Sequence, residues 1–220
     1  MARMHTYVVL LRGINVGGKN TIPMTRLKQC LEELGYSSVS TFIASGNVIL
    51  KSHQRPDQTR NRIERALPTR FQLDSDLVRA LVLTPDQLRA VIDSKPRGFG
   101  EQPKKYHSDA IFLIGIDSTQ AMSAFSPREG VDKVWSGNGV IYSQRLSSLR
   151  TKSRLNRVLA TPQYKFMTIR SWNTTTKLHE LVKAFEAGSN KVGPGHPKLR
   201  PKAPRHTSRS KKLKKGKPGA

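Results

Sequence analysis

The order of strands and helices predicted for the first 84 residues constrains the fold of this 220-residue chain more than any other feature. A β-branched, apolar run at residues 5–11 predicts a buried strand, and apolar residues at helical spacing within 24–34 predict a helix. Two strands joined by Ser45-Gly46-Asn47, a helix at 63–71 and a strand at 77–83 complete the stretch. The predicted order is strand, helix, strand, strand, helix, strand.

The second half of the chain predicts the same order again. The expected elements are strands at 110–116 and 165–169, a hairpin at 131–144, and helices at 118–125 and 152–159.

The two halves also share short strings at equivalent places. The string Leu10 to Asn15 matches Phe112 to Asp117, each at the end of a first strand. In the hairpins, Ser45-Gly46-Asn47 matches Ser136-Gly137-Asn138. A pattern used twice predicts an α+β protein made of two tandem βαββαβ units. That unit is the ferredoxin-like, split βαβ motif.

Composition and pattern together predict four regions. These are a first ferredoxin-like subdomain at 1–84, a linker with a short helix at 85–105, a second subdomain with a closing helix at 106–186, and a tail at 187–220. The tail contains eleven Lys or Arg, no acidic residue and many Pro and Gly. Such a segment cannot bury enough apolar surface to offset its chain entropy, so we expect it to be disordered.

The net charge of +24 predicts an anionic partner. Because the tail accounts for eleven of these charges, residues 1–186 still carry +13. Nucleic acid, an anionic membrane surface and phosphorylated small molecules are the partner classes that such a charge attracts. The alternative is a basic, solvated surface without a specific partner.

The single cysteine, Cys30, excludes an internal disulfide and suits a reducing compartment. No run approaches eighteen apolar residues, and the N-terminal segment lacks the long apolar region of a signal peptide. We therefore expect a soluble, cytoplasmic protein without a membrane span.

A glycine-rich edge is the main candidate site. In a βαββαβ unit, the end of the first strand and the hairpin after the second lie at the same edge of the sheet. The residues brought together there are Arg12, Gly13, Asn15, Gly17, Gly18, Lys19, Asn20, Ser45, Gly46 and Asn47. Glycines, backbone N–H groups, two cations and a following helix N-terminus favour a phosphate or carboxylate. The alternative is that the glycines serve only a tight turn.

A second candidate cluster follows the last predicted strand. It consists of Arg170, Trp172, Asn173 and Lys177. Trp172 suits either stacking on a base or anchoring the last helix in the core, and packing is favoured because buried aromatics dominate core energetics. Residues 173–175 are typical of a helix cap.

The chain offers little for other chemistries. Its six histidines show no ligand spacing, and one cysteine disfavours a structural zinc site, so no metal or cofactor is expected. No obvious acid–base pair accompanies the glycine-rich edge.

Three strings resemble one known family. They are YVVLLRGINVGGKN at 7–20 with Ile22-Pro23-Met24, TFIASGNV at 41–48, and TIRSWNTTTKL at 168–178. Together they resemble the family called domain of unknown function 1697, a group of uncharacterised bacterial proteins, over residues 4–186. Ser171 stands where that family's closing motif usually has Asn. The resemblance implies two ferredoxin-like subdomains and no established activity.

The sequence supports two hypotheses about function. The first is non-catalytic binding of nucleic acid or another phosphate-bearing ligand through the glycine-rich edge and the cationic tail. The second is an enzyme that acts on a small phosphorylated or carboxylated substrate at the same edge. Binding is preferred because the residues show no catalytic pair.

Overall fold

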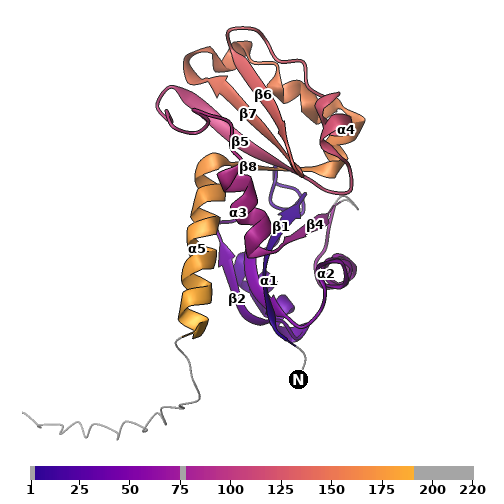
Figure 1. Ribbon diagram of the computed structural model, residues 1–220. Helices are drawn as coiled ribbons and strands as arrows, with labels where there is room; N and C mark the ends of the chain where they lie inside the picture. Colours follow the sequence, from indigo (N-terminus) through magenta and orange to yellow (C-terminus); the bar gives the residue numbers. More distant parts are fainter. Residues whose placement is uncertain (1–2, 75–77, 191–220) are drawn as a thin grey trace, which may run out of the picture.

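The computed structural model describes residues 3–74 and 78–190, and the chain has an α+β fold with two four-stranded antiparallel sheets. Figure 1 shows the two sheets one above the other, with the last helix running from the second sheet along the first. The predicted tail at 187–220 falls outside the described residues from 191 onward.

The first sheet is assembled from the N-terminal strands. The strands are β1 (His5–Arg12), β2 (Ser37–Phe42), β3 (Asn47–Ser52) and β4 (Arg79–Leu83), in the order β2-β3-β1-β4. Its helices are α1 (Met24–Glu33) and α2 (Pro56–Arg70). Each is amphipathic and buries one face: Leu27 and Leu31 of α1, and Ile63 and Leu67 of α2, pack on the sheet.

The second sheet repeats this arrangement. Its strands are β5 (Tyr106–Leu113), β6 (Asp132–Gly137), β7 (Val140–Leu146) and β8 (Met167–Ser171), in the order β6-β7-β5-β8. Helix α4 (Ser118–Met122) follows β5, and Asp117 caps it by accepting from the backbone N–H of Gln120 at 2.8 Å. We call β1–β4 with α1 and α2 the first module, and β5–β8 with the segments between them the second module.

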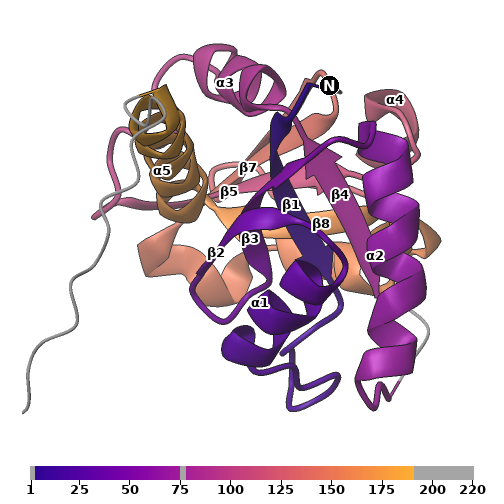
Figure 2. The ribbon, with the colours of Figure 1, turned by 90° about the horizontal axis from the view of Figure 1, so that it is seen from below.

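Two further helices join the modules. They are α3 (Pro85–Asp93) and α5 (Trp172–Asn190), which contact one another. The hydroxyl of Thr84 caps α3 by accepting from the backbone N–H of Gln87 at 3.1 Å. Figure 2 shows α3 and α5 on one side of the first sheet and α1 and α2 on the other.

Strand alternation explains the continuous apolar runs at 8–11 in β1 and 110–113 in β5. Val9 and Leu11 point into a core under α1 and α2, whereas Val8 and Leu10 point into a core shared with the second module. A third core, which contains Ile111, lies on the outer face of the second sheet. Because both faces of each central strand are covered, the pattern is continuous rather than alternating.

The predicted helix at 152–159 is wrong. The connection between β7 and β8 is instead three short 3₁₀ segments: η1 (Ser147–Lys152), η2 (Leu155–Ala160) and η3 (Pro162–Phe166). Ser153 is extended between η1 and η2, which interrupts the predicted helix, and Pro162 restricts Thr161 to an extended conformation, which ends η2.

Several predicted boundaries also move. β5 ends at Leu113 rather than at 116, because the chain turns at Gly115 with a φ of 77°. Helix α5 continues to Asn190, so residues 187–190, which composition assigned to the tail, are helical. Glu186 and Ala187 are good helix formers and carry the helix past its last apolar contacts. No helix among the described residues is long and apolar enough to cross a membrane.

Candidate anion-binding edge and cationic surface

The end of β1 lies beside the β2–β3 hairpin, as the topology argument requires. The backbone N–H of Leu11 donates to the carbonyl of Gly46 at 2.8 Å, and Leu10 pairs with Asn47 across the strands. The same contact recurs in the second module, where Leu113 donates to Gly139 at 3.0 Å. The matched tripeptides therefore occupy the same hairpin but not the same register, since the equivalent of Gly46 is Gly139 and not Gly137.

The loop after β1 forms a tight turn with an exposed tip. Gly17 and Gly18 have φ of 60° and 76°, and an isolated bridge joins Val16 to Lys19. A type I′ turn requires positive φ at both of its central residues, and glycine adopts positive φ without strain. Gly17, Gly18 and Lys19 are exposed, so they remain accessible to a ligand.

The amide side chains of this edge hold the loop itself. Asn15 donates from Nδ2 to the carbonyls of Ile22 at 3.0 Å and Ala44 at 2.8 Å, which ties the loop to the hairpin. Asn20 is 2% exposed, and its Nδ2 donates to the carbonyl of Gly13 at 2.7 Å. These contacts occupy amide groups that the sequence assigned to ligand binding.

Arg12 faces the second module. Its Nε donates to the carbonyl of Met167 at 3.1 Å, and its guanidinium lies 5.0 Å from the centroid of the Tyr164 ring. Only 8% of the residue is exposed. Burial lowers the pKa of Arg12, with nearby Arg79 acting in the same direction and Tyr164 opposing it. Arg12 therefore lies at the contact between modules rather than in an open anion site.

A different guanidinium reaches the hairpin. The Nε of Arg170, on β8, donates to Oδ1 of Asn47 at 2.6 Å. Its Nη2 donates to the carbonyls of Leu11 at 2.7 Å and Ser45 at 3.0 Å. The two clusters predicted separately from the sequence thus meet through one arginine that binds the modules together.

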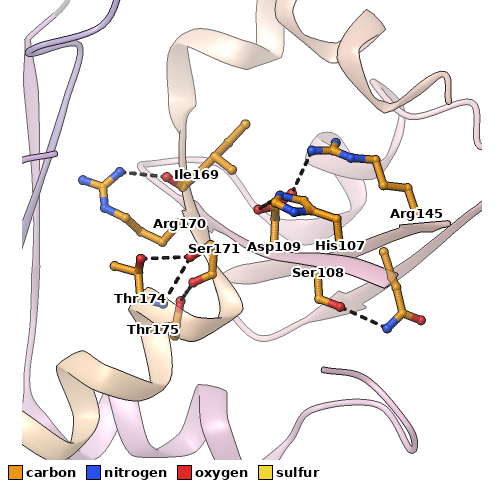
Figure 3. Close-up of polar contacts among 10 residues, drawn as sticks. His107, Ser108, Asp109, Arg145, Ile169, Arg170, Ser171, Thr174 and Thr175 are labelled. Atoms are coloured by element: carbon orange, nitrogen blue, oxygen red, sulfur yellow. Dashed lines mark hydrogen bonds and ion pairs between the residues drawn. The ribbon is translucent and has the colours of Figure 1, made fainter. Parts of the chain in front are cut away.

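The remaining bonds of Arg170 lie within its own strand. Nη1 donates to Oγ1 of Thr168 at 2.9 Å and to the carbonyl of Ile169 at 2.8 Å, the latter drawn in Figure 3. All five N–H donors of a guanidinium are then used, and every acceptor is neutral. Burial lowers the pKa of Arg170 to about 10, which leaves it charged at neutral pH.

The other members of the second cluster do not converge with Arg170. Trp172 is 7% exposed and packs edge-on against Phe99 at 5.0 Å between ring centroids, in agreement with the packing interpretation. Asn173 is exposed in the first turn of α5, and Lys177 forms an ion pair with Glu180 at 3.0 Å. The four residues do not form one pocket.

Ser171 caps α5 rather than the residues at 173–175. Its Oγ accepts from the backbone N–H of Thr174 at 3.2 Å and lies 2.9 Å from the hydroxyl of that residue (Figure 3). A short side-chain oxygen before the first helical residue satisfies an otherwise unpaired N–H. Ser171, which stands where the family's closing motif usually has Asn, is therefore the N-cap of α5 in this chain.

A cationic stretch in the second module was not singled out from the sequence. Between Asp132 and Glu180 the chain has nine Lys or Arg and no acidic residue. The middle part of this stretch connects β7 to β8 and contains η1, η2 and η3. Five exposed cations lie on or between these segments and are here called the η surface: Arg150, Lys152, Arg154, Arg157 and Lys165. A search of the sequence for long stretches without Asp or Glu would have identified this region.

The η surface cations are available to a partner. Within residues 3–74 and 78–190, none of the five forms an ion pair with an acid. By contrast, Arg60, Arg70 and Arg89 of the helices are paired with Asp57, Glu33 and Asp86. When an exposed cation without an acidic partner binds a phosphate, counterions are released and no ion pair within the protein has to be broken.

Asp109 is a buried carboxylate on the outer face of the second sheet. Oδ1 of Asp109 lies 3.2 Å from Nε2 of His107, and Oδ2 lies 3.6 Å from Nη2 of Arg145 (Figure 3). Burial raises the pKa of Asp109, while His107 and Arg145 act to lower it. No group of three or more His, Cys, Asp or Glu that could hold a metal ion occurs in the described part of the chain.

Comparison with known proteins gives a family, and solved structures are similar to the chain. The family model described as "Protein of unknown function (DUF1697)" matches residues 4–142. The solved structure of a conserved bacterial protein from Streptococcus pneumoniae is similar, with a TM-score of 0.67 and 25% identity. The likeness covers 82% of this chain and 99% of that one. No curated protein matches the chain.

Proposed function

Because the chain belongs to the DUF1697 family, whose description names no activity, we propose a function from the charges of the chain: it binds nucleic acid through the phosphate backbone, without catalysis. The observation that carries the proposal is the η surface, whose five cations are exposed and form no ion pair within residues 3–74 and 78–190. A surface of one sign attracts a polyanion at long range and holds it by neutralising phosphates.

The tail adds to the same electrostatic attraction. All eleven of its Lys and Arg lie at or after Lys191, again without an acid. Lys and Arg in a polar segment contribute sequence-independent affinity, because each neutralised phosphate releases condensed counterions. The η surface and the tail then act on one partner, and linking two weak contacts raises the overall affinity.

The glycine-rich edge supports a smaller role. Its exposed tip offers the backbone of Gly17 and Gly18 and the amine of Lys19, which suit contact with one phosphate. The alternative of an enzyme at this edge has less support. Arg12 is buried against Met167, and the carboxylate of Asp74 accepts from the backbone N–H of Asn20 at 2.6 Å. Arg12 is therefore not open to a substrate, and one oxygen of Asp74 is used to hold the loop.

Each module fits the ferredoxin-like fold. The strand orders β2-β3-β1-β4 and β6-β7-β5-β8, with the first strand of each module in the centre, support this assignment. Cytoplasmic placement accompanies the proposal, because a buried free thiol such as Cys30 suits a reducing compartment.

A salt titration tests the proposed function. Full-length protein is titrated onto a fluorescent duplex of arbitrary sequence, and log affinity is plotted against log salt. We expect binding at low salt, with a slope of about −0.9 for each phosphate contact. The double variant Arg154→Gln/Arg157→Gln should make the slope shallower by about two.

The matched control removes two cations elsewhere. Arg62→Gln/Arg65→Gln changes two exposed residues of α2, outside both cationic regions, and should leave the slope unchanged. Equal effects of the η surface and control variants would mean that only net charge matters. Absence of binding at low salt would reject the proposal.

A further inference from the structure

We infer that the nucleic acid this protein holds is double-helical rather than single-stranded. The inference rests on the proposed function and concerns which form of nucleic acid these charges select. It follows from what the surface offers besides charge, because single strands are held largely by stacking of their bases on aromatic side chains.

The protein has no exposed aromatic side chain to stack on. All seven Phe, five Tyr and two Trp lie within the described residues, and each is buried or half-buried. The large apolar side chains that are exposed there are Met4, Val16, Ile43 and Leu159. The segment 191–220 contains no Phe, Tyr or Trp either. Neither cationic region therefore includes a stacking platform.

The two rings of η3 are already covered by cations. Tyr164 has the guanidinium of Arg12 over it at 5.0 Å. Phe166 has Arg79 at 5.8 Å and Lys165 at 5.0 Å from its centroid. A base would have to displace these cation–π contacts to stack here.

The sheets offer no platform for bases. Phe112 and Tyr142 of the second sheet lie in the core between the modules and are 1% exposed. The other two aromatics of this sheet are half-buried: Trp135 packs against the same core, and Tyr106 has Lys105 over its ring at 5.3 Å. The hydroxyl of Tyr142 donates to the carbonyl of Val91 at 2.7 Å, which fixes it inside. The mode of RNA-recognition sheets, in which exposed strand aromatics stack bases, is therefore closed to this fold.

Charge alone favours the duplex. A double helix has the higher linear charge density, so each contact releases more counterion: log affinity falls by about 0.9 per decade of salt on duplex and about 0.7 on single strands. With roughly six contacts, this difference amounts to about tenfold tighter binding to duplex at 0.1 M salt.

A competition experiment tests the inference with the full chain. The protein is bound to a fluorescent 20-base-pair DNA duplex, and unlabelled duplex DNA, duplex RNA, either separated strand or oligo-dT is added at fixed salt. Both duplexes should displace the probe at about tenfold lower nucleotide concentration than any single strand. Phe166→Leu removes one of the two half-buried aromatic rings of η3 and should change neither the duplex nor the single-strand affinity.

The outcomes separate this inference from the proposed function. Single strands that compete as well as duplex, or a loss of single-strand binding in Phe166→Leu, would overturn the inference while the proposed function stands. Failure of the protein to bind any probe at low salt would overturn the proposed function itself. A second exposed-charge variant, Arg157→Gln, should weaken duplex binding and reduce the duplex slope by about one.

Discussion

The Nε of Arg170 lies 2.6 Å from Oδ1 of Asn47, although the two residues are 123 positions apart. Asn47 is fully buried, and its Nδ2 donates to the carbonyl of Phe42 at 3.1 Å. One arginine of the second module thus donates hydrogen bonds to the hairpin of the first module and to the end of β1. The modules are therefore joined by specific polar contacts as well as by their shared apolar core.

Replacing Arg170 should destabilise the whole protein. Arg170→Lys keeps the charge but loses the planar five-donor fork, so carbonyls of Leu11 and Ser45 or the Asn47 amide lose their donor. Each buried acceptor left unpaired costs about 1–3 kcal/mol, so we expect a loss on the order of 3 kcal/mol in urea unfolding. Arg65→Lys, at an exposed site, is the control and should change little. A loss below about 0.5 kcal/mol would contradict this role.

Gly46 should tolerate no side chain. A Cβ there would lie 2.8 Å from Cδ1 of Ile14 and 2.8 Å from Cβ of Leu11, at a φ of +77°. Gly139 is its equivalent in the second module, with a φ of +69° and no atom within 4 Å of such a Cβ.

Gly46→Ala and Gly139→Ala therefore share the backbone strain and differ in the clash. Overpacking costs about 1–3 kcal/mol, and we expect Gly46→Ala to be less stable than Gly139→Ala by about that amount. Thermal and urea unfolding measure the difference. Equal losses would show that strain alone governs both turns.

Asp109 should contribute more to the free energy of unfolding in mild acid than at neutral pH. Burial raises its pKa in the folded state above that in the unfolded chain. Its contribution is therefore fully present below the unfolded value of about 3.9 and is lost as pH rises through the folded pKa.

The variant Asp109→Asn removes this titration. Relative to the parent protein, its free energy of unfolding should improve progressively as the pH is raised from about 4 towards neutrality. Asp86→Asn is the control, because the pair of Asp86 with Arg89 is exposed and contributes within about 1 kcal/mol. A stability difference between Asp109→Asn and parent that stays constant with pH would contradict the prediction.

Removing residues 191–220 should weaken nucleic-acid binding without affecting the fold. If roughly half of the eleven cations engage a duplex, the slope of log affinity against log salt should become shallower by about five. The thermal unfolding midpoint should stay unchanged, because the sequence of this segment has no apolar stripe that could pack on a core. An unchanged slope would mean that the η surface alone binds the nucleic acid. A fall of many degrees in the unfolding midpoint would contradict the prediction that the fold does not depend on residues 191–220.

Much of the fold could be predicted from local pattern. The apolar run that became β1, the helical spacing of Leu27 and Leu31, and the Thr84-Pro85-Asp86 start of α3 specify their elements through contacts with near neighbours. The element order, repeated twice, is a property of the same local signals. The 3₁₀ segments between β7 and β8 were missed because their apolar spacing resembles that of a helix, whereas the extended backbone of Ser153 interrupts the chain between η1 and η2.

The sequence by itself determined that the end of β1 and the hairpin would share an edge, because strand direction follows from the order of elements. Only the tertiary structure decided which guanidinium reaches that edge. Arg12 and Arg170 each lie on a strand beside apolar residues, and nothing local distinguishes them. Docking of the modules buries Arg12 against Met167 and aims Arg170 at Asn47, because hydrogen bonds between distant segments depend on how two cores pack rather than on the residues beside them.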